Sequence, residues 1–177
     1  MDYKNFIEGE DIYLRELEIS DVTQSYCNWM NDPEVTQYLK KHPGKWTIKE
    51  LKNYVREIKK CPDVLFWAII LKDKKRHIGN IKLGHINGIN GFADIGIIIG
   101  EKSFWGKGLA TEAIKLVVNY AFSQLNLQKL IAGANKNNLG SIKIFRKDGF
   151  AELEAEEKRG FCGDSYIDGM LLKIVKK

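Results

Sequence analysis

Cysteine is scarce in this sequence of 177 residues, and its three cysteines lie far apart. Cys27, Cys61 and Cys162 form no Cys-x-x-Cys pair and are odd in number, so neither a disulfide framework nor a zinc site is indicated. The histidines, His42, His77 and His85, lack the i, i+4 spacing of helical metal ligands. The sequence therefore predicts no bound metal, and a reducing cytoplasm suits it.

Long hydrophobic runs and linkers are missing as well. No apolar run approaches membrane-spanning length, and the first residues, Met1 to Asn5, lack the basic start and apolar run of a signal peptide. With 44% hydrophobic residues, the chain is long enough to bury the core of one domain. We expect a cytoplasmic protein with no membrane partner, built as a single domain over residues 1–177.

The net charge of +5 would suit an anionic ligand, such as a nucleotide cofactor, a nucleotide-linked substrate or nucleic acid. The basic residues are scattered over expected turns and ends, where solvated charge is the ordinary explanation. No basic helix or strip of alternating aromatic and basic residues is apparent. We therefore expect no nucleic-acid partner.

Hydrophobic periodicity predicts one mixed α/β sheet structure. Strands are expected at 11–17, 64–71, 78–86, 92–99, 129–134, 150–156 and 166–175. Helices are expected from a cap at Ser20-Asp21 to Asn31, from the capping box at Thr47 to about residue 61, from Leu109 onward, and over 139–147. The stripe of the third helix that should face the sheet comprises Leu109, Ala113, Leu116, Val117, Tyr120 and Ala121.

One segment carries a clear chemical signal, a strand that leads through a glycine-rich turn into a helix. The strand 92–99 precedes the turn 104–108, and the helix starts at Leu109. Such a turn presents free backbone N–H groups and the positive end of a helix dipole, which bind phosphate oxygens. Gly106 and Gly108 would let the backbone approach a pyrophosphate, and Lys107 adds charge. The turn matches neither a nucleoside-triphosphate loop nor a dinucleotide fingerprint, and an ordinary strand-to-helix turn is the alternative.

Motifs in a fixed order surround this turn. They are Ile12-Tyr13-Leu14-Arg15, Trp29-Met30-Asn31-Asp32-Pro33-Glu34-Val35, Asp94-Ile95-Gly96, Thr111-Glu112-Ala113, Asn138-Leu139-Gly140-Ser141 and Lys147-Asp148-Gly149-Phe150. Together with the turn they resemble the GNAT superfamily of acetyl-CoA-dependent N-acetyltransferases over nearly the whole chain. The resemblance is to the branch that includes the ribosomal-protein-alanine (RimJ/RimL-type) enzymes.

The resemblance implies an α/β (α+β) fold of the GNAT type, with a mixed, mostly antiparallel central sheet whose middle strands splay apart, flanked by helices. It implies acetyl-CoA as the acetyl donor, with its pantetheine arm in the gap between those strands. The cofactor-binding residues that it implies are Ile97, Ile99, Trp105, Gly106, Lys107, Gly108, Leu109, Ala110, Thr111, Asn135, Asn138 and Ser141. Trp105 stands where the superfamily usually has Gln or Arg. Both glycines of the turn, Gly106 and Gly108, are present.

The resemblance also implies catalytic roles. Asp94 matches the acidic residue that acts as the base, directly or through a water molecule, and strand alternation places it on the face opposite Ile95. The alternative for Asp94 is a solvated carboxylate. Phe145 stands where many members have a tyrosine that protonates the sulfur, which leaves Ser141 as a second catalytic candidate or as an ordinary partner of first-turn N–H groups. Glu112 is expected to complement the helix dipole or fix the turn.

The acceptor is the least determined part. The segments that line the acceptor pocket in relatives contain Trp29, Asn31, Tyr38, Phe161 and Tyr166, for which packing is the alternative role. A basic surface attracts a phosphate-bearing sugar and repels basic ribosomal tails, so a small amine such as an amino sugar is favoured. The alternatives are an N-terminal protein acetyltransferase and a non-catalytic acetyl-CoA-binding module. Either a monomer or a homodimer is expected.

Overall fold

The computed structural model describes residues 6–39, 44–154 and 169–176. The strands are β1 Phe6–Glu8, β2 Ile12–Glu16, β3 Leu65–Leu71, β4 Arg76–Asn87, β5 Phe92–Ile99, β6 Lys129–Asn135, β7 Ala151–Glu152 and β8 Gly169–Val175. The helices are α1 Gln24–Asn31, α2 Pro33–Thr36, α3 Ile48–Lys59, α4 Leu109–Ser123 and α5 Leu139–Lys147, with short 3-10 turns η1 Ile19–Asp21 and η2 Lys102–Phe104.

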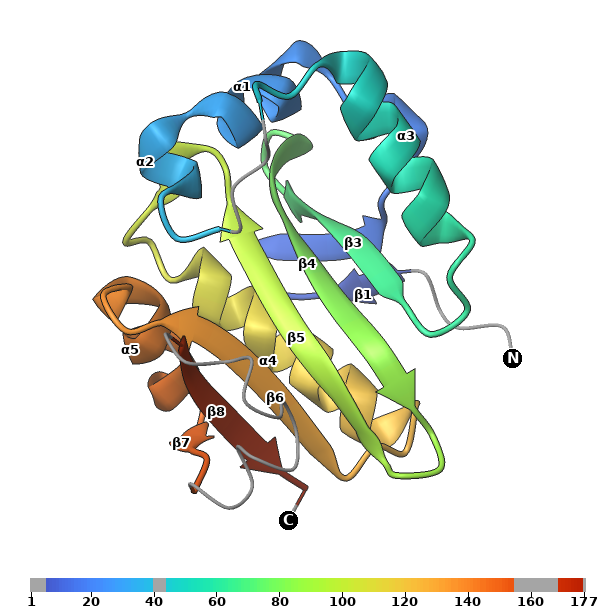
Figure 1. Cartoon of the computed structure of the whole chain (residues 1–177), viewed down its shortest axis with the longest axis vertical. Coiled ribbons are helices and arrows are strands. Elements are labelled where there is room, and N and C mark those ends of the chain that lie inside the picture. The colour runs from blue at the N-terminus through green and yellow to red at the C-terminus, as the bar shows by residue number, and fades with distance from the viewer. Residues whose placement is uncertain (1–5, 40–43, 155–168, 177) are drawn as a thin grey trace.

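The strands form one 8-stranded sheet in the order β1-β2-β3-β4-β5-β6-β8-β7 (Figure 1). Every neighbouring pair is antiparallel except β5 and β6, which are parallel. A parallel pair needs a crossover connection, and α4 supplies it between these two strands. The predicted mixed, mostly antiparallel sheet flanked by helices is confirmed.

Helix α4 covers one face of the sheet with the stripe that its periodicity predicts. Leu109, Ala113, Val117, Tyr120 and Ala121 are buried, and Leu116 packs against them partly buried. A second cluster on the other face joins β3 to α1 and α3. Burial on both faces explains why β3 reads as a continuous apolar run rather than an alternating one.

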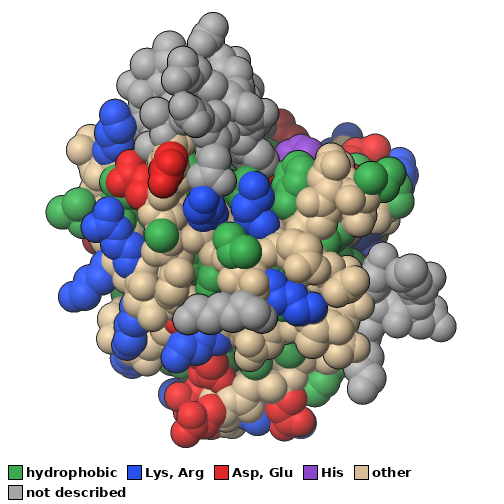
Figure 2. Space-filling view, turned by 90° about the horizontal axis from the view of Figure 1, so that it is seen from below, with side chains coloured by type: hydrophobic (Ala, Val, Ile, Leu, Met, Phe, Trp, Pro, Cys, Tyr) green, Lys and Arg blue, Asp and Glu red, His purple; other side chains and the backbone are tan. Residues whose placement is uncertain are grey.

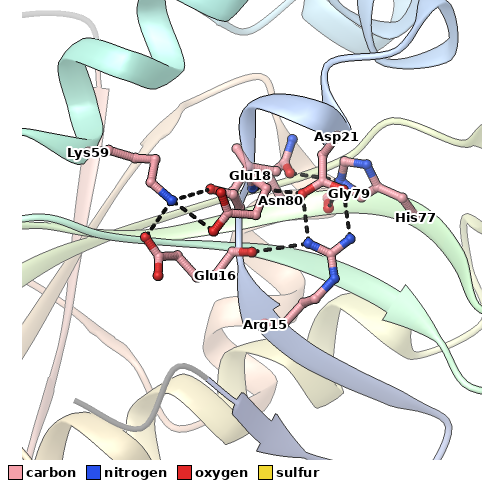
Figure 3. Close-up of polar contacts among 9 residues, drawn as sticks. Arg15, Glu16, Glu18, Asp21, Lys59, His77, Gly79 and Asn80 are labelled. Carbon is pink, nitrogen blue, oxygen red and sulfur yellow. Dashed lines mark hydrogen bonds and ion pairs between the residues drawn. The ribbon is translucent and has the colours of Figure 1, made fainter. Parts of the chain in front are cut away.

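The start of the first helix differs from the prediction. Ser20 and Asp21 belong to the 3-10 turn η1, and α1 begins only at Gln24, with Thr23 as its N-cap. The reason is that Asp21 has other partners. Its carboxylate accepts both guanidinium branches of Arg15, at 2.6 and 2.7 Å, and the N–H of Glu18 at 2.7 Å (Figure 3).

The Arg15–Asp21 pair ties β2 to the segment that leads into α1. Burial opposes ionisation of Asp21, yet the hydrogen bonds from Arg15 and the Glu18 N–H hold the pKa of its carboxyl below the usual range. His77 lies close by on β4 (Figure 3), where burial lowers the pKa of its imidazole. Its Nε2 is 2.9 Å from the carbonyl oxygen of Gly79, so a neutral ring donates there.

The surface charge is spread rather than gathered. In Figure 2, blue lysine and arginine side chains are interspersed with red carboxylates. Several basic side chains pair with acidic neighbours, such as Lys60 with Glu57 and Lys72 with Glu8. Within the described residues, no helix has both the length and the apolar character needed to cross a bilayer.

Asp148 ends α5 with both carboxyl oxygens buried and without a hydrogen-bond partner among the described residues. Burial raises the pKa of this carboxyl to about 6, although Lys115 and Lys147 oppose the shift. The negative end of the helix dipole also disfavours a charge there. Because the pKa is raised in the folded state, protonated Asp148 stabilises the fold at low pH, and this contribution is lost as the pH rises through about 6.

We expect Asp148→Asn to raise the Tm by a few degrees at pH 8, because the amide keeps the shape of the carboxyl without its charge. The gain should shrink towards pH 4, where the carboxyl of the wild type is protonated. Thermal unfolding between these pH values measures the effect, with Asp73→Asn in the exposed β3–β4 turn as the control. A variant that is no more stable than the wild type at pH 8 would contradict this reading of Asp148.

Candidate active site

The site begins where β5 and β6 part. Their parallel pairing runs from Phe92 with Lys129 to Ile95 with Ala132 and then stops. Beyond this point β5 stays paired with β4 as far as Ile99, while β6 follows β8 (Figure 1). The predicted splaying of the middle strands is therefore confirmed, and the backbone edges of residues 96–99 and 133–135 face a gap in the sheet.

The turn before α4 lies at the end of β5. Gly106 and Gly108 have φ angles of 75° and 84°, a left-handed conformation that favours glycine. Gly108 is the N-cap of α4 and supplies no side chain to cap the helix. Among the described residues, none accepts a hydrogen bond from the backbone N–H groups of residues 106–111. These donors and the positive end of the α4 dipole together are suited to binding an anion, and we call residues 106–111 the candidate anion site.

Trp105 fixes this turn to the strand before it. Its indole Nε1 donates to the carbonyl oxygen of Ile99 at 2.7 Å, and the ring remains 40% exposed. The ammonium of Lys107 lies 5.0 Å from the centroid of the Phe104 ring, which is within the range of a cation–π contact. Trp105, which replaces the usual Gln or Arg, thus has a local structural role. Its hydrogen bond uses the carbonyl oxygen of Ile99, a residue that the resemblance assigned to cofactor binding.

The connection from β6 to α5 carries three more of the predicted cofactor residues. Asn135 shapes the turn, because its carbonyl oxygen accepts from Asn138 N at 2.9 Å. Asn138 is the N-cap of α5, and its side-chain oxygen accepts from Ser141 N at 3.0 Å. The capping role therefore belongs to Asn138, and the Ser141 hydroxyl has no hydrogen-bond partner among the described residues. Helix α5 packs beside α4, on the side of the gap where α4 begins (Figure 1).

Asp94 lies on the opposite face of β5 from the α4 core, as strand alternation predicts. Ala93 and Ile95 are buried against α4, whereas the Asp94 side chain is 29% exposed. Two glycines leave space around it. Gly84 is its cross-strand neighbour, and a Cβ added there would lie 3.0 Å from Asp94 Oδ2, while a Cβ at Gly96 would meet no atom within 4 Å.

His85 is a neighbour of Asp94 that the sequence did not reveal. Its Nδ1 hydrogen-bonds to Asp94 Oδ1. Regular alternation would turn His85 away from the face that Gly84 and Asp94 share. The register between β4 and β5 shifts after Gly84, and His85 has a φ angle of 47°, so a β-bulge changes the direction of its side chain. A bulge of this kind is not visible in hydrophobic spacing.

Three of the predicted acceptor residues are described by the structure: Trp29 and Asn31 support the fold, and Tyr38 is exposed. Trp29 is buried, and a Cβ at Gly100 would overlap its indole, so Trp29 packs on the chain that leaves β5. Asn31 clamps the segment before α3: its amide donates to the carbonyl of Trp46 and accepts from Trp46 N, both at 2.8 Å. Tyr38 is 37% exposed after α2. Of these three residues, only Tyr38 is exposed.

Phe161 and Tyr166 lie outside the described residues. The same holds for the predicted loop between the last two strands. Among the residues that are described, no group of three or more His, Cys, Asp and Glu side chains is placed to hold a metal ion.

Glu112 is a structural residue. Its Oε1 accepts from the backbone N–H groups of Glu10 at 2.6 Å and Asp11 at 3.1 Å, which anchors the β1–β2 turn to the first turn of α4. Gly9 makes room for this contact, since a Cβ there would lie 2.3 Å from the same oxygen. The expectation that Glu112 fixes a turn rather than acting as an acid agrees with this geometry.

The parted strands and the glycine turn beside them are the features that the resemblance to the GNAT superfamily predicts. A family model described as "Acetyltransferase (GNAT) domain" matches residues 11–151. The chain therefore belongs to the GNAT acetyltransferase family, and the predicted class of enzyme, an N-acetyltransferase, is confirmed. The narrower resemblance to the ribosomal-protein-alanine branch stays a prediction.

The sequence is similar to bacterial N-acetyltransferases over most of its length. It is 30% identical over 169 residues to an uncharacterized N-acetyltransferase of Bacillus licheniformis, covering 92% of this chain and 93% of the relative. It is 32% identical over 169 residues to the spermidine N(1)-acetyltransferase of Escherichia coli K12, covering 95% of this chain and 85% of that one.

Solved structures share the fold. A GNAT-family acetyltransferase from Bacillus anthracis superimposes with a TM-score of 0.79 at 22% identity, over 96% of this chain and 98% of the other. The spermidine N-acetyltransferase of Vibrio cholerae, solved in complex with CoA and spermine, has a TM-score of 0.77 at 25% identity, over 93% of this chain and 95% of that one.

We expect Glu112→Ala to lower the free energy of unfolding by about 1–3 kcal/mol, because it leaves backbone donors without an acceptor. Glu112→Gln keeps an oxygen at the same place and should retain most of this stability and the full rate of acetyl transfer. Denaturant unfolding and steady-state kinetics of both variants check this. Loss of turnover in a stable Glu112→Gln protein would show that the carboxylate takes part in catalysis.

Proposed function

We propose that this protein transfers the acetyl group of acetyl-CoA to the primary amine of a small molecule. The observation that carries the proposal is the turn 106–111, where backbone N–H groups without described partners meet the start of α4 beside the gap in the sheet. An anion of pyrophosphate type fits this turn. A carboxylate on the open face of β5 lies next to the same gap.

Different segments of the chain would bind the pyrophosphate and the pantetheine arm of the cofactor. The turn residues would donate backbone hydrogen bonds to the pyrophosphate, and Lys107 would add positive charge. The gap-facing backbone of β5 at Ile97 and the amide nitrogens of Asn135 and Asn138 are suited to the polar groups of the pantetheine arm. When bound, acetyl-CoA supplies an activated thioester carbonyl. The protein has to hold an amine against that carbonyl in a reactive orientation.

Asp94 is the proposed base. An alkylamine with a pKa near 10.4 is neutral only about one time in 2,500 at pH 7, so removing its proton is part of the work of the enzyme. Gly84 and Gly96 form a strip of this face that carries no side chains: the Asp94 carboxylate lies over Gly84, and the strip is open at Gly96, which gives an amine access to the carboxylate. Direct transfer without an acyl-enzyme needs no nucleophile from the protein, which agrees with a site that contains a carboxylate and free donors.

Ser141 is the proposed partner of the departing sulfur. Phe145 has no proton to give because its side chain is a phenyl ring, and this ring is buried in the core, edge-on to Phe150 at a centroid distance of 5.1 Å. The Ser141 hydroxyl, by contrast, is half-buried at the start of α5 and not used for capping. A hydroxyl at this place would donate a hydrogen bond to the thiolate as it leaves.

For the acceptor, we propose an amino sugar first and a polyamine second. Lys82 is the cross-strand partner of Gly96 and lies on the same face of the sheet as Asp94. A cation beside the carboxylate favours an acceptor that carries one amine and a phosphate, and disfavours a polycation. The polyamine is supported by the similarity to spermidine acetyltransferases.

A panel of amines separates these possibilities. Acetyl-CoA consumption is measured with amino sugars and nucleotide-linked amino sugars, with spermidine and spermine, and with peptides that have a free N-terminus. Turnover on a small amine supports the proposal, and its class identifies the acceptor. Activity on peptides alone, or acetyl-CoA binding without transfer to any amine, would overturn it.

We expect Asp94→Asn to lower kcat by about a hundredfold or more and to change the affinity for acetyl-CoA by less than about twofold, because a base acts on the chemical step. Steady-state kinetics with the best acceptor, together with calorimetric titration of acetyl-CoA, separate the two effects. The control is Asp73→Asn, remote from the gap. Unchanged turnover in Asp94→Asn would refute the role of this carboxylate.

A further inference from the structure

His85 is bound to the proposed base, and no other described residue donates a hydrogen bond to the Asp94 carboxylate. The imidazole is held by Nδ1 alone, while its side chain is 83% exposed. The contact depends on the β-bulge that follows Gly84, because regular strand geometry would direct His85 to the other face. The bulge requires the unfavourable positive φ angle of 47° at a residue other than glycine. The bulge thus brings the imidazole of His85 onto the Asp94 carboxylate.

The two oxygens of Asp94 have different surroundings. Oδ1 accepts from His85 Nδ1. Oδ2 has no hydrogen-bond partner among the described residues and lies over the backbone of Gly84, next to the open space at Gly96. Along β5, Asp94 immediately precedes Ile95, the last residue that is paired with β6. On β4, His85 follows Gly84 in the direction of the hairpin turn, so Asp94 stands between His85 and the start of the gap.

We propose that His85 is a positioning residue for Asp94, an inference that rests on the proposed acetyl transfer. The imidazole donates from Nδ1–H to Oδ1 and fixes the rotamer of the carboxylate. Oδ2 is then directed to the open strip, where it meets the amine of the acceptor. A carboxylate held by one hydrogen bond loses less rotational entropy when the acceptor arrives, which is the advantage of preorganisation.

The proton balance of the step is simple. The ammonium group of the acceptor gives one proton to Oδ2, so that its N–H bond breaks and an O–H bond forms. The carboxylate becomes a neutral carboxylic acid and the amine recovers its lone pair for attack on the thioester carbonyl. The Nδ1–H bond of His85 stays intact throughout, and no oxidant or further reactant takes part.

Asparagine and alanine at position 85 test this role. The amide nitrogen of Asn takes nearly the place of imidazole Nδ1, and Asn tolerates a positive φ angle. We expect His85→Ala to lower kcat by about ten- to a hundredfold, the usual effect of losing an orienting hydrogen bond, with little change in the affinity for acetyl-CoA. His85→Asn should keep kcat within about threefold of the wild type.

The controls separate positioning from a loss of structure. Thermal unfolding shows whether each variant is folded, and Ile89→Ala, at a 98% exposed position in the same hairpin, should have wild-type kinetics. His85→Ala is also introduced into Asp94→Asn. If His85 acts through Asp94, this second change should lower kcat by less than about twofold, because coupled residues are not additive.

Several results would overturn the positioning role. These are wild-type kcat in His85→Ala, an equal loss in His85→Asn and His85→Ala, and a full effect of His85→Ala in the Asp94→Asn background. The proposed function is judged separately, by whether the wild type acetylates any amine. An active wild type with an unchanged His85→Ala variant would refute the role of His85 alone, whereas an inactive wild type would refute both.

Discussion

The structure of the site depends on the loss of pairing between β5 and β6 after Ile95 and Ala132. Each strand continues with a different neighbour, β5 with β4 and β6 with β8, so the sheet keeps its hydrogen bonds on both sides while it opens in the middle. Backbone groups inside a protein are costly to leave without partners. A gap bordered by unpaired strand edges is therefore suited to a ligand that carries amide groups of its own.

The backbone N–H groups at the start of α4 are held in place by contacts with neighbouring parts of the fold. A left-handed Gly108 and a helix terminus without a side-chain cap would be weak points in isolation. They are supported because the α4 stripe is buried against the sheet and Glu112 ties the first turn of the helix to the β1–β2 turn. Trp105 adds a bond to the end of β5. Packing and hydrogen bonds outside the anion site thus stabilise a turn whose own N–H groups remain available.

Sequence patterns predicted the parts of the molecule that follow local rules. The strand 92–99 and the helix 139–147 were correct at both ends: glycines lie on either side of the strand, and Asp148-Gly149 ends the helix. The residues that escaped prediction depend on tertiary contacts. Asp21 binds Arg15 and the Glu18 N–H instead of capping α1, Asn31 at the end of α1 clamps Trp46 before α3, and His85 reaches Asp94 only through a bulge. The motifs therefore predict a cofactor side for the site, and this stays a prediction, whereas the acceptor side depends on contacts between distant segments.

In the proposed function, the glycine turn before α4 binds the pyrophosphate of acetyl-CoA. Calorimetric titration of acetyl-CoA into the wild type, Gly108→Ala and Gly88→Ala tests it most directly. Gly108 has a φ angle of 84°, so a Cβ costs about 1–2 kcal/mol in the bound conformation, whereas Gly88 has open space and ordinary backbone angles. We predict that Gly108→Ala weakens binding about 5- to 30-fold and that Gly88→Ala binds like the wild type. Equal affinity in Gly108→Ala and the wild type, or no binding to the wild type, would contradict the account.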